Sequence, residues 1–224
     1  MKHFTFTSAL ILSAAAIAAA ETATERLASS ADVFREIMAT PDKGIPQDLL
    51  AKAQCVIIVP GLKKGAFVVG AEFGRGFAEC RKADGYGWGA PGAVRVEGGS
   101  VGFQVGGSST DVVMLVMNKR GMQKLLGDKF TLGADASVAA GPVGRTVDAS
   151  TDARMDAEIL AWSRAKGLFA GIALKGATLR NDADVNAELY GRKIDNKEVL
   201  SGAVEPPASS QALRSALDTY SMRK

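Results

Sequence analysis

Few side chains in this sequence are suited to catalysis. The only histidine among the 224 residues is His3, in an N-terminal segment of the kind that is removed on export. Without histidine, the rest of the chain cannot form a Ser-His-Asp triad or its Cys-His variants. The sequence also contains neither an H-E-x-x-H zinc helix nor a G-x-x-x-x-G-K-[ST] phosphate-binding loop. These absences exclude the commonest hydrolase and nucleotide-binding sites.

Carboxylates and cysteines are the remaining candidates for chemistry. Asp152, Asp156 and Glu158 lie close together in the sequence, but their spacing lacks the signature of a paired-carboxylate hydrolase. Two cysteines, Cys55 and Cys80, cannot complete a Cys-His zinc site in a chain without further histidines. An oxidising compartment would permit a disulfide between them, but the spacing leaves buried free thiols open as the alternative. We therefore expect no enzymatic activity, no cofactor and no metal site.

The first 20 residues have the layout of a secretory signal peptide. Lys2 supplies a positive charge, Phe4–Ile17 an apolar stretch and Ala18–Ala20 a small-residue cleavage site before Glu21. The alternative is a membrane anchor, but the apolar run is shorter than the ~20 residues that a span needs. We expect a periplasmic protein with no transmembrane span after cleavage. The formal net charge of +3, without long runs of one sign, argues against a nucleic-acid partner.

The elements that must position any site indicate a single α+β domain. Glycine accounts for 25 of 224 residues, above the usual ~7%, which favours a fold rich in strands and turns. Helical spacing or flanking signals predict helices at 24–39, 46–53, 119–126, 181–190 and 211–220. Strand patterns occur at 55–59, 65–73, 77–82, 93–96, 101–105, 111–117, 155–164 and 168–174. We predict a many-stranded, mostly antiparallel sheet or barrel-like core with a few flanking helices.

Local signals refine this prediction at several points. Pro60-Gly61 marks the end of the first strand, and Gly74-Arg75-Gly76 indicates a tight hairpin turn. The strand at 155–164 is expected to be buried on both faces, with Trp162 in the core. Residues 203–224 are predicted to form a linker and a short peripheral helix, which leaves 21–202 as the domain.

Several ordered motifs in this domain resemble one known family. They are Val59–Gly61, Gly65–Gly70, Ser109–Val113, Lys129–Arg145, Ser163–Gly171 and the set Asn186, Tyr190 and Gly191. Together they closely resemble the SYLF domain, also called Ysc84-like, over roughly residues 25–202. The resemblance implies a membrane-lipid-binding module. Eukaryotic members bind phosphoinositides and some bind or bundle actin, but an exported chain would not meet actin, so actin is not expected as a partner.

Together, the resemblance and the export signal imply affinity for anionic phospholipids such as phosphatidylglycerol or cardiolipin. Headgroup phosphates require lysine and arginine side chains presented together, with backbone N–H groups nearby. Residues 51–82 contain six basic and two acidic side chains, and three further basic residues lie within the motifs. The candidate headgroup-binding residues are Lys63, Lys64, Arg75, Arg81, Lys82, Arg145, Arg164 and Lys166. Alternatively, these residues only solubilise the surface, and Arg145 braces its loop through Asp135 or Asp148.

A different class of function remains open beside lipid binding. The chain has features of an envelope structural or protein-interaction module that associates through exposed strand edges and does not depend on lipid. Trp88, which has glycine neighbours, is a candidate for an exposed side chain that inserts at an interface. The sequence itself sets no oligomeric state.

Overall fold

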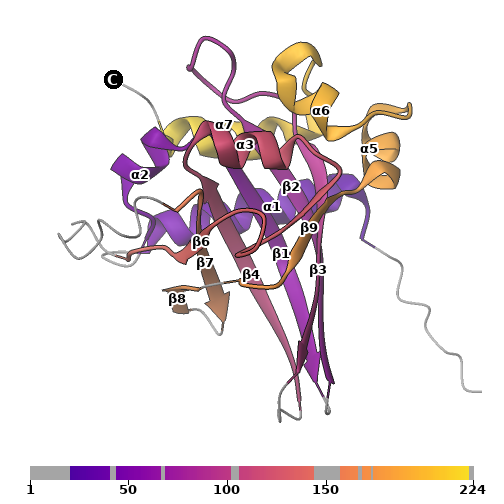
Figure 1. The fold of residues 1–224 in the computed structure, drawn as a ribbon. Coiled ribbons are helices and arrows are strands. Elements are labelled where there is room, and N and C mark those ends of the chain that lie inside the picture. Colours follow the sequence, from indigo (N-terminus) through magenta and orange to yellow (C-terminus); the bar gives the residue numbers. More distant parts are fainter. Residues whose placement is uncertain are drawn as a thin grey trace, which may run out of the picture.

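The computed structural model describes residues 21–40, 44–66, 69–101, 106–143, 157–165, 168–172 and 174–221. Within these ranges the chain forms one α+β domain, in which helices cover one end of a long, curved sheet (Figure 1). This confirms the predicted fold class. The predicted signal peptide lies outside the described residues. None of the described helices has both the length and the apolar character needed to cross a bilayer.

The described residues contain a nine-stranded sheet. The strands follow the order β5-β9-β3-β2-β1-β4-β7-β6, and β8 also pairs with β7. All pairs are antiparallel except β6 with β7, which is parallel. The strands are β1 Cys55–Ala66, β2 Val69–Cys80, β3 Gly92–Val101, β4 Gly106–Val116, β5 Lys129–Thr131, β6 Val138–Ala140, β7 Ile159–Ala165, β8 Leu168–Gly171 and β9 Thr178–Asn181.

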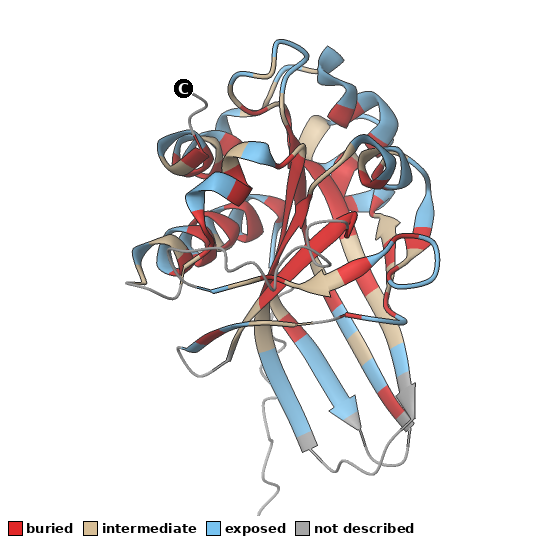
Figure 2. Ribbon diagram, turned by 60° about the vertical axis from the view of Figure 1, so that its left-hand side comes forward, coloured by how far each residue is buried: buried red, intermediate tan, exposed pale blue. Residues whose placement is uncertain are grey.

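Apolar side chains are buried on both faces of this sheet. On one face, Leu27 and Leu217 from two helices belong to the same cluster as Phe77 of β2. On the other face, Ile57 of β1 shares a cluster with Leu125 of a third helix. The described α-helices are α1 Ala23–Ala39, α2 Gln47–Lys52, α3 Lys119–Leu125, α5 Ala183–Tyr190, α6 Asn196–Glu198 and α7 Gln211–Ser221, and a short π-helix (Val199–Ala203) and a 3-10 helix (Ala208–Ser210) lie between α6 and α7. Both clusters occupy the helix-covered half of the long strands, which leaves the other half of β1–β4 outside the core (Figure 2).

Helices α1 and α7 both form where they are predicted, but α7 is not peripheral. Thr22 and Glu25 form a capping box at the start of α1, which satisfies backbone donors that the first turn leaves free. Helix α7 packs along α1, where the rings of Phe34 and Tyr220 meet edge to face with centroids 6.1 Å apart. Leu217 of α7 is fully buried. The prediction of a peripheral C-terminal helix is therefore wrong, because this helix covers part of the apolar surface of α1.

The predicted hairpin turn at Gly74-Arg75-Gly76 is also wrong. These residues lie inside β2, and the chain reverses between Ala66 at the end of β1 and Val69 at the start of β2. A Cβ atom on Gly76 would lie 1.9 Å from the carbonyl oxygen of Ile58 on β1. Glycine is needed here for the close approach of two backbones, and not for a turn.

Strand β1 likewise continues past the predicted stop at Pro60-Gly61. Gly61 has a φ of 57°, a left-handed conformation that glycine adopts without strain. The pairing register of β1 shifts between Val59 and Leu62, as expected for a β-bulge. Just beyond this shift, β1 passes from the buried Leu62 to the exposed Lys63.

Most of the other predicted strands match strands of the structure. Strand β7 is buried on both faces, because Leu160 and Trp162 belong to one core cluster and Ile159 and Ala161 to the other. Its predicted hairpin partner is β8. The predictions at 93–96 and 111–117 coincide with parts of β3 and β4. Residues 102–105 of the predicted strand 101–105 lie outside the described residues.

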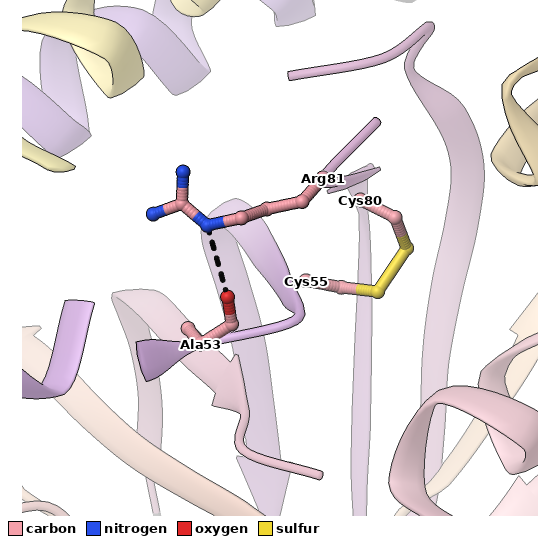
Figure 3. Close-up of a disulfide and its surroundings, with 4 residues drawn as sticks. All are labelled: Ala53, Cys55, Cys80 and Arg81. Atoms are coloured by element: carbon pink, nitrogen blue, oxygen red, sulfur yellow. Dashed lines mark hydrogen bonds between the residues drawn. A yellow bond between two sulfur atoms is a disulfide. The ribbon is translucent and has the colours of Figure 1, made fainter. Parts of the chain in front are cut away.

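Cys55 and Cys80 form a disulfide with an S–S distance of 2.05 Å (Figure 3). They face each other at the first residue of β1 and the last residue of β2. Residues directly opposite each other on antiparallel strands have Cβ atoms within disulfide reach. The spacing in the sequence left a disulfide and buried free thiols as alternatives, and the strand register selects the disulfide.

Candidate functional site

The sheet extends well beyond the helices at the ends of β1–β4 (Figure 1). We call this part the distal sheet; it consists of Lys63–Ala66, Val69–Phe73, Gly98–Val101 and Gly106–Ser109. Most of its described side chains are exposed, whereas the same strands are buried near the helices (Figure 2). Phe73 is 46% exposed, which is unusual for a large apolar side chain. The distal sheet is thus an accessible surface held by a rigid, paired backbone.

Two exposed lysines lie at the base of the distal sheet. Lys63 is opposite Phe73 of β2, and Lys64 is opposite Glu72. Consecutive strand residues point to opposite faces, so the two ammonium groups lie on different sides of the sheet. Lys64 Nζ lies 3.0 Å from a carboxylate oxygen of Glu72, whereas Lys63 forms no ion pair with a described residue. Lys63 therefore contributes the unbalanced positive charge at this level.

Arg75 lies in the middle of β2 and not at a turn. Its Nε atom is 3.0 Å from the carboxylate of Asp182, which is 1% exposed and directly precedes α5. The guanidinium carbon also lies 5.8 Å from the ring centroid of Phe73. Arg75 thus joins the sheet to α5, and an internal carboxylate offsets its charge.

Arg81 directly follows β2, at the end opposite the distal sheet, and its side chain makes internal contacts. Its guanidinium donates a hydrogen bond to the carbonyl oxygen of Ala53 at 3.2 Å (Figure 3). It also donates to the carbonyl oxygens of Leu50 at 3.2 Å and Ser221 at 2.9 Å. It also lies 4.4 Å above the ring of Trp88. Trp88 is fully buried, and its Nε1–H donates to the Ser221 hydroxyl at 2.8 Å. The prediction of an exposed Trp88 is wrong, because this ring packs in the core, below the Arg81 guanidinium and against Ser221 of α7.

The basic residues between 51 and 82 do not form one patch. Lys82 is exposed and follows Arg81 beyond the disulfide. Arg81 comes nine positions after Glu72, the partner of Lys64, which corresponds to about 30 Å at the usual rise per strand residue. Only Lys63 and Lys64 lie together on the distal sheet. The predicted single cluster is therefore corrected to a lysine pair at one end and Lys82 at the other.

Arg164 forms the centre of an ion network on β7. Its guanidinium lies 2.6 Å from the carboxylate of Asp111 on β4 and also pairs with Glu36 of α1. The other carboxylate oxygen of Asp111 accepts a hydrogen bond from the N–H of Gly61 at 2.9 Å. The guanidinium carbon lies 5.7 Å from the ring centroid of Phe169. This arrangement joins α1, the β1 bulge and β7, so Arg164 has a structural role.

The last two candidate residues lie outside the described residues. These are Arg145 and Lys166, and Asp148, an expected partner of Arg145, is outside as well. Asp135, the other expected partner, accepts a hydrogen bond from the N–H of Thr131 at 2.7 Å. The loop containing Asp135 is therefore braced by a backbone contact.

A buried carboxyl group, Glu79 of β2, was not anticipated from the sequence. It is 1% exposed, and neither of its oxygens has a hydrogen-bond partner among the described residues. Burial raises its pKa well above 4.5, nearby Arg214 lowers the pKa, and Asp218 raises it. Burial and the proximity of Glu79 also raise the pKa of Tyr190. Alternation with Phe77 on the same face was the available sign that Glu79 points into the core.

Acidic side chains do not form a metal site in the described part of the chain. No group of three or more histidine, cysteine, aspartate or glutamate side chains there is arranged to hold a metal ion. Glu158 accepts a hydrogen bond from the N–H of Ser137 at 2.8 Å, which fixes the start of β7. Asp152 and Asp156 lie outside the described residues.

Comparison with known proteins gives consistent matches. A family model described as Ysc84, Las17-binding protein actin regulator, matches residues 97–220. The chain is 34% identical over 181 residues to SH3 domain-containing YSC84-like protein 1 of Bos taurus, covering 80% of this chain and 52% of that protein. It is 38% identical to an SH3 domain-containing protein of Schizosaccharomyces pombe over 78% of this chain and 41% of the relative. It is 34% identical to LAS seventeen-binding protein 3 of Saccharomyces cerevisiae, over 80% and 39% respectively. The chain thus spans about half the length of these relatives, or less.

Proposed function

This chain belongs to the Ysc84 family, also called the SYLF family, and we propose that it is a non-enzymatic module that binds membranes containing anionic phospholipids. The signal-like segment at residues 1–20 supports export to the periplasm. The description of the family names Las17 binding and actin regulation, and one relative is named LAS seventeen-binding protein 3. A periplasmic chain would not meet actin, so the proposed partner is the membrane surface.

The exposed lysine pair on the distal sheet is the observation that carries this proposal. Of the six described candidate residues, Arg75, Arg81 and Arg164 make internal contacts. Lys63 and Lys64 are exposed on the distal sheet, the part that the helices leave bare, and Lys64 pairs there with Glu72 of the neighbouring strand. A basic residue close to an anionic membrane contributes about 1 kcal/mol, screened by salt over roughly 8 Å at physiological ionic strength. Two lysines can therefore give weak, reversible and salt-sensitive binding.

Vesicle co-sedimentation of the exported form, which begins at Glu21, tests the proposal. Zwitterionic phosphatidylcholine vesicles are compared with vesicles that also contain phosphatidylglycerol or cardiolipin, at low and high salt. We expect binding to the anionic vesicles only, and weaker binding in high salt. The double substitution Lys63→Ala/Lys64→Ala should weaken binding by roughly 30-fold, from about 1 kcal/mol per lysine.

A matched control removes the same charge elsewhere. Lys124 and Lys129 are exposed on α3 and β5, away from the distal sheet. The double substitution Lys124→Ala/Lys129→Ala should bind anionic vesicles as the unaltered protein does. Equal losses in both double variants would mean that overall charge, and not the distal sheet, governs binding.

The alternative is an interaction module of the envelope that does not depend on lipid. Leu168 favours this reading, because it is 66% exposed on β8, a strand that pairs only with β7 among the described residues. Exposed strand edges can pair with a further chain. If no vesicle composition binds the protein, the membrane proposal fails. A defined oligomer that Leu168→Lys disrupts would then support the interaction module.

A further inference from the structure

The charged residues of the distal sheet all lie at one end of it. Its only charged residues are Lys63, Lys64 and Glu72, which all lie at its base, next to the core. The described residues beyond them are glycine, alanine, serine and valine. The molecule thus presents an uncharged end, with one lysine on each face at the level where this end begins.

No described side chain covers one face of this end. Gly99, Ala71, Gly65 and Gly107 are direct neighbours across β3, β2, β1 and β4. A Cβ atom on Gly65 would meet nothing within 4 Å, and on Gly99 or Gly107 it would meet only a backbone oxygen at 3.9 Å. None of these three glycines has a positive φ. Neither packing nor backbone conformation within the described chain therefore accounts for glycine at these positions.

We infer that the distal sheet enters the headgroup layer of an anionic membrane end-on, with Lys63 and Lys64 near the outer surface of that layer and within side-chain reach of the phosphates. This inference rests on the proposed function and adds to it an orientation and a depth. Three residues separate Lys63 from Ala66 at the end of β1, or about 10 Å. Interfacial elements are typically buried to about 5–10 Å. Because one lysine projects from each face, phosphates on both sides of an end-on sheet can be contacted.

Strand pairing limits how deep this end can go. β1 and β2 are paired on both sides along the distal sheet. β3 pairs with β9 only from Val94 to Glu97, and β4 pairs with β7 only from Asp111 to Val116. Beyond these pairs, the outer edges of β3 and β4 have no strand partner among the described residues, and unpaired backbone groups cannot be buried in hydrocarbon without cost. The headgroup layer supplies water and polar partners for them, so insertion stops there.

Charge also favours a membrane over a second copy of this chain. Two copies stacked through the uncovered face would bring the unbalanced charge of each Lys63 toward the other. Like charges at close range oppose such a contact. Anionic headgroups instead complement Lys63, whose charge no carboxylate of the described residues offsets.

A fluorescent label tests the depth directly. Cys55 and Cys80 are buried in a disulfide, so a new cysteine from Ala71→Cys can be labelled selectively with the environment-sensitive dye NBD. With phosphatidylcholine–cardiolipin vesicles, we expect a blue shift in the emission and quenching by lipids that carry a spin label near the headgroup. The same label at Gln123→Cys, an exposed position on α3, should show neither effect.

A charge substitution gives an independent test. Ala71→Asp adds a negative charge on an exposed residue of the uncharged end and should weaken vesicle binding by about tenfold or more. Gln123→Asp, with the same charge change, should bind within about twofold of the unaltered protein.

Vesicle binding with an unshifted label at residue 71 would overturn end-on insertion and leave surface binding intact. A lipid-independent shift that grows with protein concentration would identify a second copy as the occupant and also overturn it. Absence of any vesicle binding would refute the proposed function itself.

Discussion

Replacing Glu79 by glutamine should change how the stability of this fold depends on pH. Glu79 lies on β2 inside the core, with no hydrogen-bond partner among the described residues. The charged groups that affect it are Arg214 and Asp218 on α7, and Tyr190 on α5 is coupled to it. Burial is the largest cause and raises the pKa of the Glu79 carboxyl well above 4.5, so the folded state favours the neutral acid.

The sign of the effect follows from proton binding in the two states. Below pH 4.5 the carboxyl is protonated in both the folded and the unfolded chain, and its contribution to stability does not change with pH. Above pH 4.5 the unfolded chain loses this proton while the folded chain keeps it. The free energy of unfolding therefore falls by about 1 kcal/mol per pH unit, until the pH reaches the raised pKa of the folded state. At this slope, the largest possible loss over the two pH units from 5 to 7 is about 3 kcal/mol.

Urea unfolding at several pH values measures this contribution. Trp88 and Trp162 are fully buried, so their fluorescence reports global unfolding. Glu79→Gln keeps the shape of the side chain but cannot ionise. We expect the difference in unfolding free energy between Glu79→Gln and the unaltered protein to move in favour of the variant as the pH rises from 5 to 7. Glu205→Gln, at an exposed position, controls for the change in net charge. A difference that stays constant to within about 0.5 kcal/mol over this range would refute the reasoning.

Three further predictions concern stability and use the same urea assay. The double substitution Cys55→Ala/Cys80→Ala opens a loop of 25 residues and should lower the free energy of unfolding by about 3 kcal/mol; an unchanged midpoint would contradict this. Gly76→Ala forces a Cβ atom against the facing strand and should cost about 2 kcal/mol or more, whereas Gly65→Ala, which meets nothing, should be neutral or slightly stabilising. Asp111→Asn should cost about 2 kcal/mol through its arginine partner, and a loss below about 0.5 kcal/mol would mean that the ion network is dispensable.

Elements with a strong periodic pattern were predictable from the sequence. Helix α1 repeats apolar residues at helical spacing, and β7 is a short apolar run that fills both faces of the sheet. These patterns are local, because the period of the buried side chains follows directly from the geometry of a helix or a strand. The matching residues therefore identify the element before any partner is known.

The structural roles of individual glycines were not predictable from the sequence. Gly74 and Gly76 resemble a turn in the sequence, but they lie in the middle of β2, where the neighbouring strand comes close. The same residue type serves turns, bulges and close backbone contacts, so its role depends on what packs against it. The packing of the C-terminal helix was not predictable for a similar reason, because its partner α1 lies at the other end of the sequence.

For the candidate site, the sequence by itself determined which side chains carry positive charge, that the chain lacks histidine chemistry beyond residue 3, and which family its motifs resemble. Only the tertiary structure decided which of those charges are available. Arg75 meets Asp182, and Arg164 meets Asp111, because strand pairing brings together residues that are far apart in the chain. Lys63 and Lys64 remain accessible because β1 and its neighbours continue past the helices. Charge is a property of a residue, whereas its availability depends on contacts between distant segments, which no local pattern contains.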